Sequence, residues 1–89
     1  MKKKFNPFTS IYPSIDLHGE DKVNAIIKVD EFINDSIKLK HKNIIVIHGK
    51  GSYVLKGAIH EYLKRDKRVE KYGLDINTGQ TIISLKFDK

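Results

Sequence analysis

Residues 43–52 have the sequence Asn-Ile-Ile-Val-Ile-His-Gly-Lys-Gly-Ser (NIIVIHGKGS), and this stretch decides the fold. Residues 43–47 contain a continuous β-branched run, which is typical of a strand buried on both faces of a sheet. Gly49 and Gly51 then allow backbone conformations that are closed to other residues. Helical spacing begins at Ser52, a good helix cap. The stretch therefore predicts a central strand, a glycine-rich loop and the start of a helix.

Strand and helix patterns alternate on both sides of this stretch. Upstream, Ile15 and Leu17 share one face of a period-two segment, and a long segment with three- and four-residue apolar spacing follows it. We expect the order β-α-β-α-β-β: strand 14–18, helix 20–40, strand 43–47, helix 52–65, strand 69–76 and strand 80–87. The sequence predicts one compact α/β domain over residues 14–89, after an extended or partly disordered basic arm at residues 1–13.

Composition limits the class of protein. The 89 residues include no cysteine, which excludes disulfides and thiolate metal sites and fits a reducing compartment. Residues 2–4 are lysines, but residues 5–9 (FNPFT) interrupt the apolar segment that a signal peptide would need. No apolar run approaches the ~20 residues of a membrane-spanning helix. We expect a cytoplasmic protein, monomeric and without a membrane partner.

Positive charge is concentrated in the middle of the chain. The 17 Lys and Arg residues exceed the 11 Asp and Glu residues, for a net charge of +6, and residues 42–71 hold eight basic residues against three acids. Clustered basic residues are typical of nucleic-acid binders. The alternative is a lysine-rich composition without a functional meaning.

The first two expected strands bring two polar segments together. One helix joins these strands, and such a crossover makes them parallel, so both end at the same edge of the sheet. Asp16, His18 and Gly19 follow the first strand, and the loop 48–51 follows the second. Ligands bind at this edge in open α/β sheets.

The loop has the form of a phosphate site. Free N–H groups at the start of the following helix attract phosphate, and Lys50 adds a positive charge. It is not a Walker A loop, because Gly51 follows Lys50 and Ile44 stands where that motif needs glycine. We therefore exclude ATP and GTP hydrolysis.

Asp16, His18 and His48 are the candidate catalytic residues. Side chains at positions 16 and 18 share one face of a strand, so the Asp16 carboxylate could orient the His18 imidazole or hold a divalent cation, Mg²⁺ or Mn²⁺. His18 and His48 could then serve as base and acid in phosphodiester cleavage. The alternative makes Asp16 a cap at the helix entry and His18 a half-buried structural residue.

Three other residues have weaker patterns. His41 is expected at the surface and His60 within the structure, and histidine spacing matches no usual zinc site. Tyr53, just after the loop, is expected either to stack on a base or to pack within the protein.

The segments IDLHG (15–19), VIHGKG (46–51) and LKGAIHEYL (55–63), in this order, resemble the Smr, or small MutS-related, domain. The resemblance covers residues 14–87. It implies an α/β sandwich similar to the C-terminal domain of a bacterial translation initiation factor. It also implies function, since several members are nicking endonucleases acting on DNA or RNA and others only bind.

The resemblance assigns roles to both motifs. Residues 16–19 match the motif that goes with cleavage, and residues 48–51 match the loop that contacts nucleic acid. The chain departs from many members at residues 52–54, Ser-Tyr-Val, where they carry Thr-Gly, but it keeps a basic residue at Lys56.

Our hypothesis from the sequence is a nucleic-acid-binding Smr domain with nicking endonuclease activity. The expected nucleic-acid contacts are Gly19, Gly49, Lys50, Gly51, Ser52, Lys56, Lys64, Arg65, Lys67 and Arg68. The alternatives are a non-catalytic module that binds RNA, DNA or a ribosome-like surface, and a small protein-interaction domain. DNA and RNA remain equal candidates, with or without a metal ion.

Overall fold

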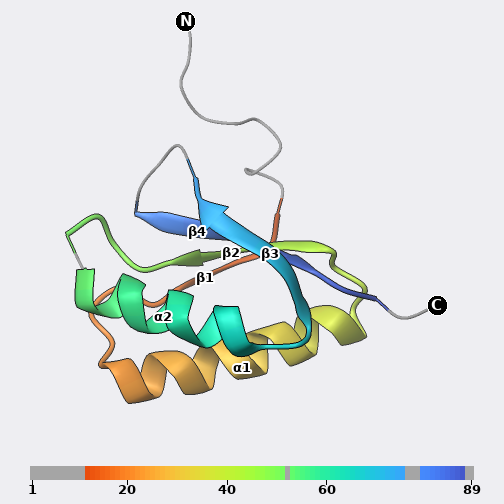
Figure 1. Cartoon of the computed structure of the whole chain (residues 1–89), viewed down its shortest axis with the longest axis horizontal. Helices are drawn as coiled ribbons and strands as arrows, with labels where there is room; N and C mark the ends of the chain where they lie inside the picture. Colours follow the sequence, from red (N-terminus) through yellow and green to blue (C-terminus); the bar gives the residue numbers. More distant parts are fainter. Residues whose placement is uncertain (1–11, 52, 76–78, 88–89) are drawn as a thin grey trace, which may run out of the picture.

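The computed structural model describes residues 12–51, 53–75 and 79–87 and has the predicted order of elements (Figure 1). The elements are β1 (Ser14–Asp16), α1 (Lys22–Lys38), β2 (Asn43–Ile47), α2 (Tyr53–Arg65), β3 (Val69–Leu74) and β4 (Gln80–Leu85). The β-α-β-α-β-β prediction is confirmed, but the first, third and fourth strands and the first helix are shorter than expected. Ser52, most of the predicted arm (residues 1–11) and most of the predicted turn (77–78) lie outside the described residues.

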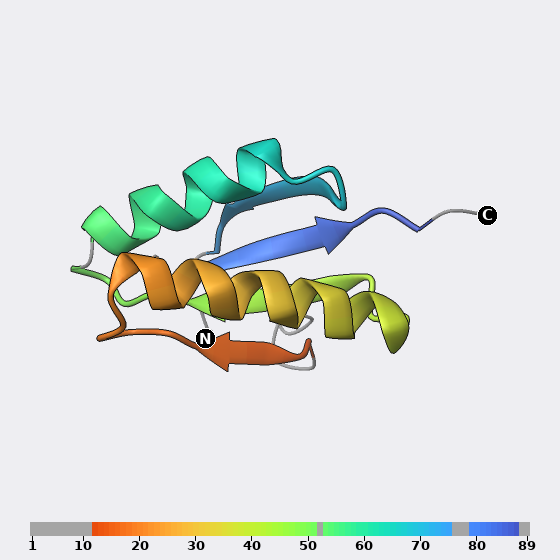
Figure 2. The same ribbon diagram turned by 90° about the horizontal axis from the view of Figure 1, so that it is seen from below.

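The four strands form one mixed sheet in the order β1-β2-β4-β3. β1 is parallel to β2, as its helical crossover predicts, and the pairs β2–β4 and β4–β3 are antiparallel. Both helices lie on one face of this sheet and run side by side (Figures 1 and 2). The molecule is therefore a two-layer sandwich in which both helices begin at the same edge of the sheet.

The core lies between the two layers and follows from the apolar spacing. On the helices, buried residues recur every four positions, at Ala25, Val29 and Ile33 in α1 and at Leu55, Ile59 and Leu63 in α2. On the sheet, alternate residues of β2 and β4 face them, including Ile44, Val46, Ile83 and Leu85. Ile45 faces the other way and is also buried, so the prediction of a strand buried on both faces is confirmed.

Local hydrogen bonds set the ends of α1. Asp21 caps its N-terminus by accepting a 2.8 Å bond from the Asn24 N–H. At the other end, the N–H of Lys40 donates to the Ile37 carbonyl and that of His41 to the Ser36 carbonyl. This pair of bonds is a Schellman motif, and it places Lys40 in the left-handed region, with φ 62°. The motif usually has glycine at that position.

Candidate functional site

The two polar segments meet at the carboxyl edge of the β1–β2 pair. Asp16 lies opposite Ile47 in the parallel register, and the Leu17 N–H donates to the Ile47 carbonyl at 2.7 Å. The residues after these strands, 17–19 and 48–51, therefore leave the sheet side by side. Both helices begin at this edge (Figure 1), so the positive ends of two helix dipoles point toward it.

Asp16 and His18 form a hydrogen-bonded pair at the surface. One Asp16 carboxylate oxygen lies 2.7 Å from His18 Nδ1 and accepts a second bond, of 3.1 Å, from the His18 backbone N–H. The side chains are 54% and 70% exposed, respectively. Gly19, with φ +85°, follows in the left-handed conformation, and the chain turns there toward α1.

This geometry differs from the structural alternative for the pair, and the catalytic interpretation stays a prediction. Asp21, and not Asp16, caps α1, and His18 is exposed rather than half-buried. The hydrogen bond between them lowers the pKa of Asp16 and raises the pKa of His18. Because Nδ1 faces the carboxylate, the Nε2 atom of His18 is left for an outside partner.

His48, in contrast, is fully buried behind the loop. Its Nε2 lies 2.9 Å from the Thr81 hydroxyl and its Nδ1 lies 3.2 Å from the Gly49 carbonyl. The same hydroxyl lies 2.7 Å from His60 Nε2, and the His60 ring packs edge-on against Tyr72. Thr81, itself buried, therefore joins the histidine of the loop to a histidine of α2.

The acceptors fix the protonation of this chain. A carbonyl only accepts, so His48 Nδ1 carries the proton and His48 Nε2 accepts from the Thr81 hydroxyl. The Thr81 oxygen in turn accepts from His60 Nε2–H. Burial lowers the pKa of both imidazoles, which favours their neutral forms. A proton added to His48 Nε2 would remove the acceptor of the Thr81 hydroxyl and so break this chain of hydrogen bonds.

These depressed pKa values predict a pH-dependent stability. The unfolded chain takes up protons on His48 and His60 near their ordinary pKa, about 6.5, before the folded protein does. The free energy of unfolding should therefore decrease as the pH falls from about 7.5 to about 5.5, where carboxylates with ordinary pKa values stay ionised, although the raised pKa of exposed His18 opposes part of this decrease. Urea titrations across this range measure it. A constant free energy of unfolding would contradict it.

Sequence reasoning missed Thr81 as a partner of these histidines. The signal was available, because Thr81 lies on the same face of the alternating strand as Ile83 and Leu85. A lone hydroxyl residue on an apolar face needs a buried hydrogen-bond partner. His48 and His60 are the two hydrogen-bond partners that Thr81 has in the structure.

The loop is shaped by Gly49. Its φ of +94° lies in the left-handed region, and the N–H groups of His48 and Gly49 both donate to the Gly79 carbonyl at 2.9 Å. Gly51 has no positive φ, and a Cβ placed on it would meet no atom within 4 Å. Of the two loop glycines, the left-handed backbone is thus needed only at Gly49. Lys50 is exposed between them.

The predicted basic contacts separate into two groups. Lys50 and Lys56 lie near the loop, and the Lys56 ammonium is 5.1 Å from the centre of the Tyr53 ring. Tyr53 is 73% exposed, so it does not pack into the core. The other group, Lys64, Arg65, Lys67 and Arg68, lies at or beyond the end of α2, a 13-residue helix that is about 20 Å long.

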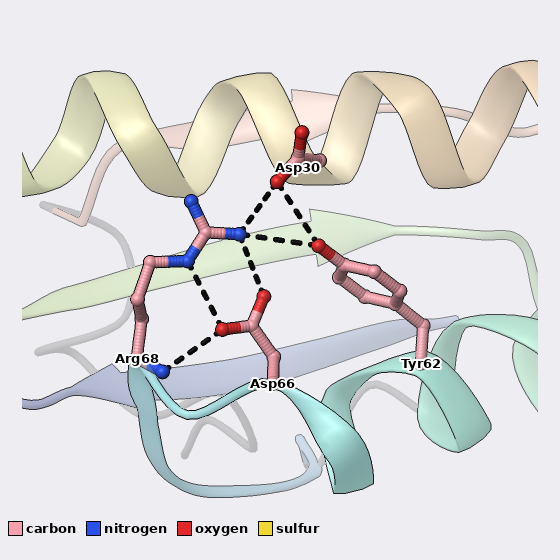
Figure 3. A network of polar contacts seen from close by, with 4 residues as sticks. All are labelled: Asp30, Tyr62, Asp66 and Arg68. Carbon is pink, nitrogen blue, oxygen red and sulfur yellow. Dashed lines mark hydrogen bonds and ion pairs between the residues drawn. The ribbon is translucent and has the colours of Figure 1, made fainter.

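Arg68 is held within the protein by two carboxylates (Figure 3). Its guanidinium donates to Asp66 at 2.7 Å, to Asp30 at 2.6 Å and to the Tyr62 hydroxyl at 3.1 Å. The Tyr62 hydroxyl also donates to Asp30. This network ties α1 to α2 and to the start of β3, and the bonds to Arg68 lower the pKa of both carboxyls. Arg68 has a structural task in addition to any contact with a ligand.

The described residues contain neither a metal-binding cluster nor a membrane-spanning helix. In the parts of the chain that the structure describes, no three His, Cys, Asp or Glu residues gather to hold a metal ion, so Asp16 and His18 stand as a pair. No helix in those parts is long and apolar enough to span a bilayer.

Comparisons with known proteins agree with the predicted fold and with the resemblance to the Smr domain. The sequence profile of the Smr domain matches residues 15–86. The chain is 41% identical over 71 residues to a protein named endonuclease MutS2 from Finegoldia magna, and 38% identical over 81 residues to one of the same name from Clostridium acetobutylicum. These matches cover 80% and 86% of this chain but only 9% and 10% of those proteins.

Two solved structures have the same fold. The Smr domain of Thermus thermophilus MutS2 superposes with a TM-score of 0.79 at 32% identity, covering 83% of this chain and 98% of that domain. YdaL from Escherichia coli, described as a stand-alone small MutS-related protein, superposes with a TM-score of 0.80. The sequence identity in that second case is 20%, over 85% of this chain and 68% of YdaL.

Proposed function

The chain belongs to the Smr domain family, and from this premise we propose that it binds nucleic acid and nicks its backbone at the carboxyl edge of β1 and β2. The observation that carries the proposal is the exposed Asp16–His18 pair on the strand next to the one that leads into the Lys50 loop. The name of the two relatives, endonuclease MutS2, supports the proposal.

In this proposal His18 is the general acid. Cleavage breaks a P–O bond, and the leaving oxygen needs a proton, which the Nε2 atom of a protonated His18 can deliver. The attacking oxygen, from water or a neighbouring 2′-hydroxyl, loses its own proton to solvent. Asp16 holds Nδ1 and raises the pKa of His18, which keeps more of the acid form present near neutral pH.

The phosphate is held by the loop. In our proposal Lys50 and the backbone N–H group of Gly51 bind the phosphate as negative charge develops on it, and the helix dipoles favour that charge. Gly19 allows close approach on the other side. In our proposal His48 positions this loop through its bond to the Gly49 carbonyl and does not exchange protons with the substrate, because it is buried. A divalent cation at Asp16 would complete its coordination with water or phosphate oxygens.

A cleavage assay tests the proposal. Purified protein is incubated with supercoiled plasmid, single-stranded RNA and branched DNA, each in Mg²⁺, Mn²⁺ or EDTA. We expect nicks in at least one substrate, which identifies the substrate class and the need for a metal. No cleavage of any substrate by a protein that still binds them would contradict the nuclease.

One observation favours a second candidate, a non-catalytic module that binds nucleic acid or a ribosome-like surface. With His48 buried, His18 is the histidine of the two motifs that can meet a substrate. The same assay separates the candidates, since the module binds without cutting. The cytoplasmic location and the monomeric state stay predictions from the sequence.

Binding should weaken steeply with salt. Each neutralised phosphate releases counterions, which gives a slope of about −0.7 to −0.9 in log affinity against log salt concentration. Lys50→Gln should reduce the magnitude of the total slope by the share of one phosphate contact, about 0.7 to 0.9. Lys71→Gln, on β3, should leave the slope unchanged. Fluorescence anisotropy at several salt concentrations measures both. An affinity independent of salt would count against the basic residues as contacts.

A further inference from the structure

A second basic site lies at the end of the molecule opposite the Asp16–His18 pair. An open cavity of about 800 Å³ is lined by residues at or just beyond the ends of α1, α2 and β4. Its basic lining residues are Lys40, Lys67, Arg68 and Lys86, and its other lining residues include Asn34, Ile37 and Phe87. We call this cavity the end pocket. It shares no lining residue with the carboxyl edge.

The charge of the end pocket is largely uncompensated. Arg68 is bonded to Asp30 and Asp66, but Lys40, Lys67 and Lys86 make no ion pair with an acid among the residues described by the structure. Glu70, whose pKa is lowered partly by Lys86, is engaged by Lys42 at 2.6 Å. Three ammonium groups around one cavity repel each other, and an anion between them would relieve that repulsion.

The rest of the lining suits a nucleotide rather than a bare anion. The Phe87 ring is 36% exposed at the cavity and provides a face on which a base can stack. Ile37 extends the apolar surface, and the Asn34 amide can donate to or accept from a base edge. Lysines that hold phosphates next to an aromatic ring are the usual combination in single-strand binding.

We propose that the end pocket binds a second segment of the same nucleic-acid strand, by its phosphates and one stacked base. The proposal rests on the proposed function. It adds a requirement for length, because α2 separates the end pocket from the loop by about 20 Å, which corresponds to about six phosphates along a helical strand. Shorter strands reach one site only.

Anisotropy with labelled oligoadenylates, of RNA and of DNA, from about three to about twelve nucleotides tests the proposal on the whole chain, because stacked adenines keep a single strand helical. For the unchanged protein we expect affinity to rise steeply once the strand passes about six nucleotides. In Lys67→Gln/Lys86→Gln, long strands should bind about tenfold more weakly and short strands equally well. Phe87→Ala should weaken long strands at least about fivefold. Lys71→Gln is the charge control and should match the unchanged protein.

The outcomes separate this proposal from the one on which it rests. Binding that has the same length dependence in the double variant as in the unchanged protein overturns the end pocket and leaves the nuclease proposal intact. Absence of binding at every length in every variant overturns both. Equal weakening of short and long strands in the double variant also overturns the end pocket, because it shows a general charge effect.

Discussion

Replacing His18 with alanine is expected to slow strand cleavage by roughly 10²–10⁴-fold, the usual contribution of a general acid, while affinity for the strand changes little. The side chain is exposed, and its one hydrogen bond among the described residues is to Asp16, so we expect its removal to leave the core and the loop unchanged. The experiment compares single-turnover cleavage and anisotropy for the two proteins. Full cleavage by pure His18→Ala protein would place the chemistry elsewhere.

Asp16→Asn provides the matched control for this role. Loss of the carboxylate removes the interaction that raises the pKa of His18, so the acid form persists only to a lower pH. If His18 donates a proton, the rate falls as the pH rises through its pKa. That fall should occur at lower pH in Asp16→Asn than in the unchanged protein. A pH profile that is the same in both would show that Asp16 does not tune His18.

Thr81→Val should cost about 2–3 kcal/mol of the free energy of unfolding, and so lower the melting temperature by about 10 °C or more. Valine has nearly the same shape but no hydroxyl, so the Nε2 atoms of His48 and His60 both lose their partner. His48 is fully buried and has no access to water in exchange. At present no buried side-chain nitrogen or oxygen in the described residues lacks a partner.

Thr81→Ser keeps the hydroxyl and removes only a methyl group, which should cost about 1 kcal/mol. The comparison of the two variants, by urea and thermal unfolding near neutral pH, isolates the hydrogen bonds from packing. Equal stability of the valine and serine variants would show that the chain of bonds contributes nothing. The valine variant should keep the dependence of stability on pH, because the burial that lowers the pKa of both imidazoles is unchanged.

The fold could be predicted from the sequence because its strongest patterns are local. Three patterns predict most of the arrangement. The apolar run at residues 43–47 predicts a central strand, the four-residue spacing predicts the buried face of each helix, and the crossover rule predicts parallel first and second strands. The same rule predicted that residues 16–19 and 48–51 would meet. The first strand ends early, at Asp16, because the Glu20 N–H bonds to the Leu17 carbonyl and closes a turn.

The burial of individual site residues could not be predicted in this way. The alternation of apolar and polar residues gives the same expectation for an exposed histidine as for a buried one. In the structure, the position of Thr81 across the sheet gives His48 a buried partner that His18 does not have. A count of charges along the sequence also does not show where the basic residues lie in the folded molecule. The basic residues between 42 and 71 look like one cluster in the sequence, but α2 holds them at two ends of the molecule.

If the end pocket binds a strand as we propose, Lys40 contributes to binding at a cost in stability. In the left-handed conformation an ordinary side chain crowds its own backbone, and glycine would relieve that strain. A stabilised version of this domain would therefore place glycine at position 40, and protein engineers choosing substitutions by thermal screening alone would select it. In doing so they would remove one of the three ammonium groups of the end pocket. On this proposal, the more heat-resistant variant would bind a long strand more weakly than the unchanged protein.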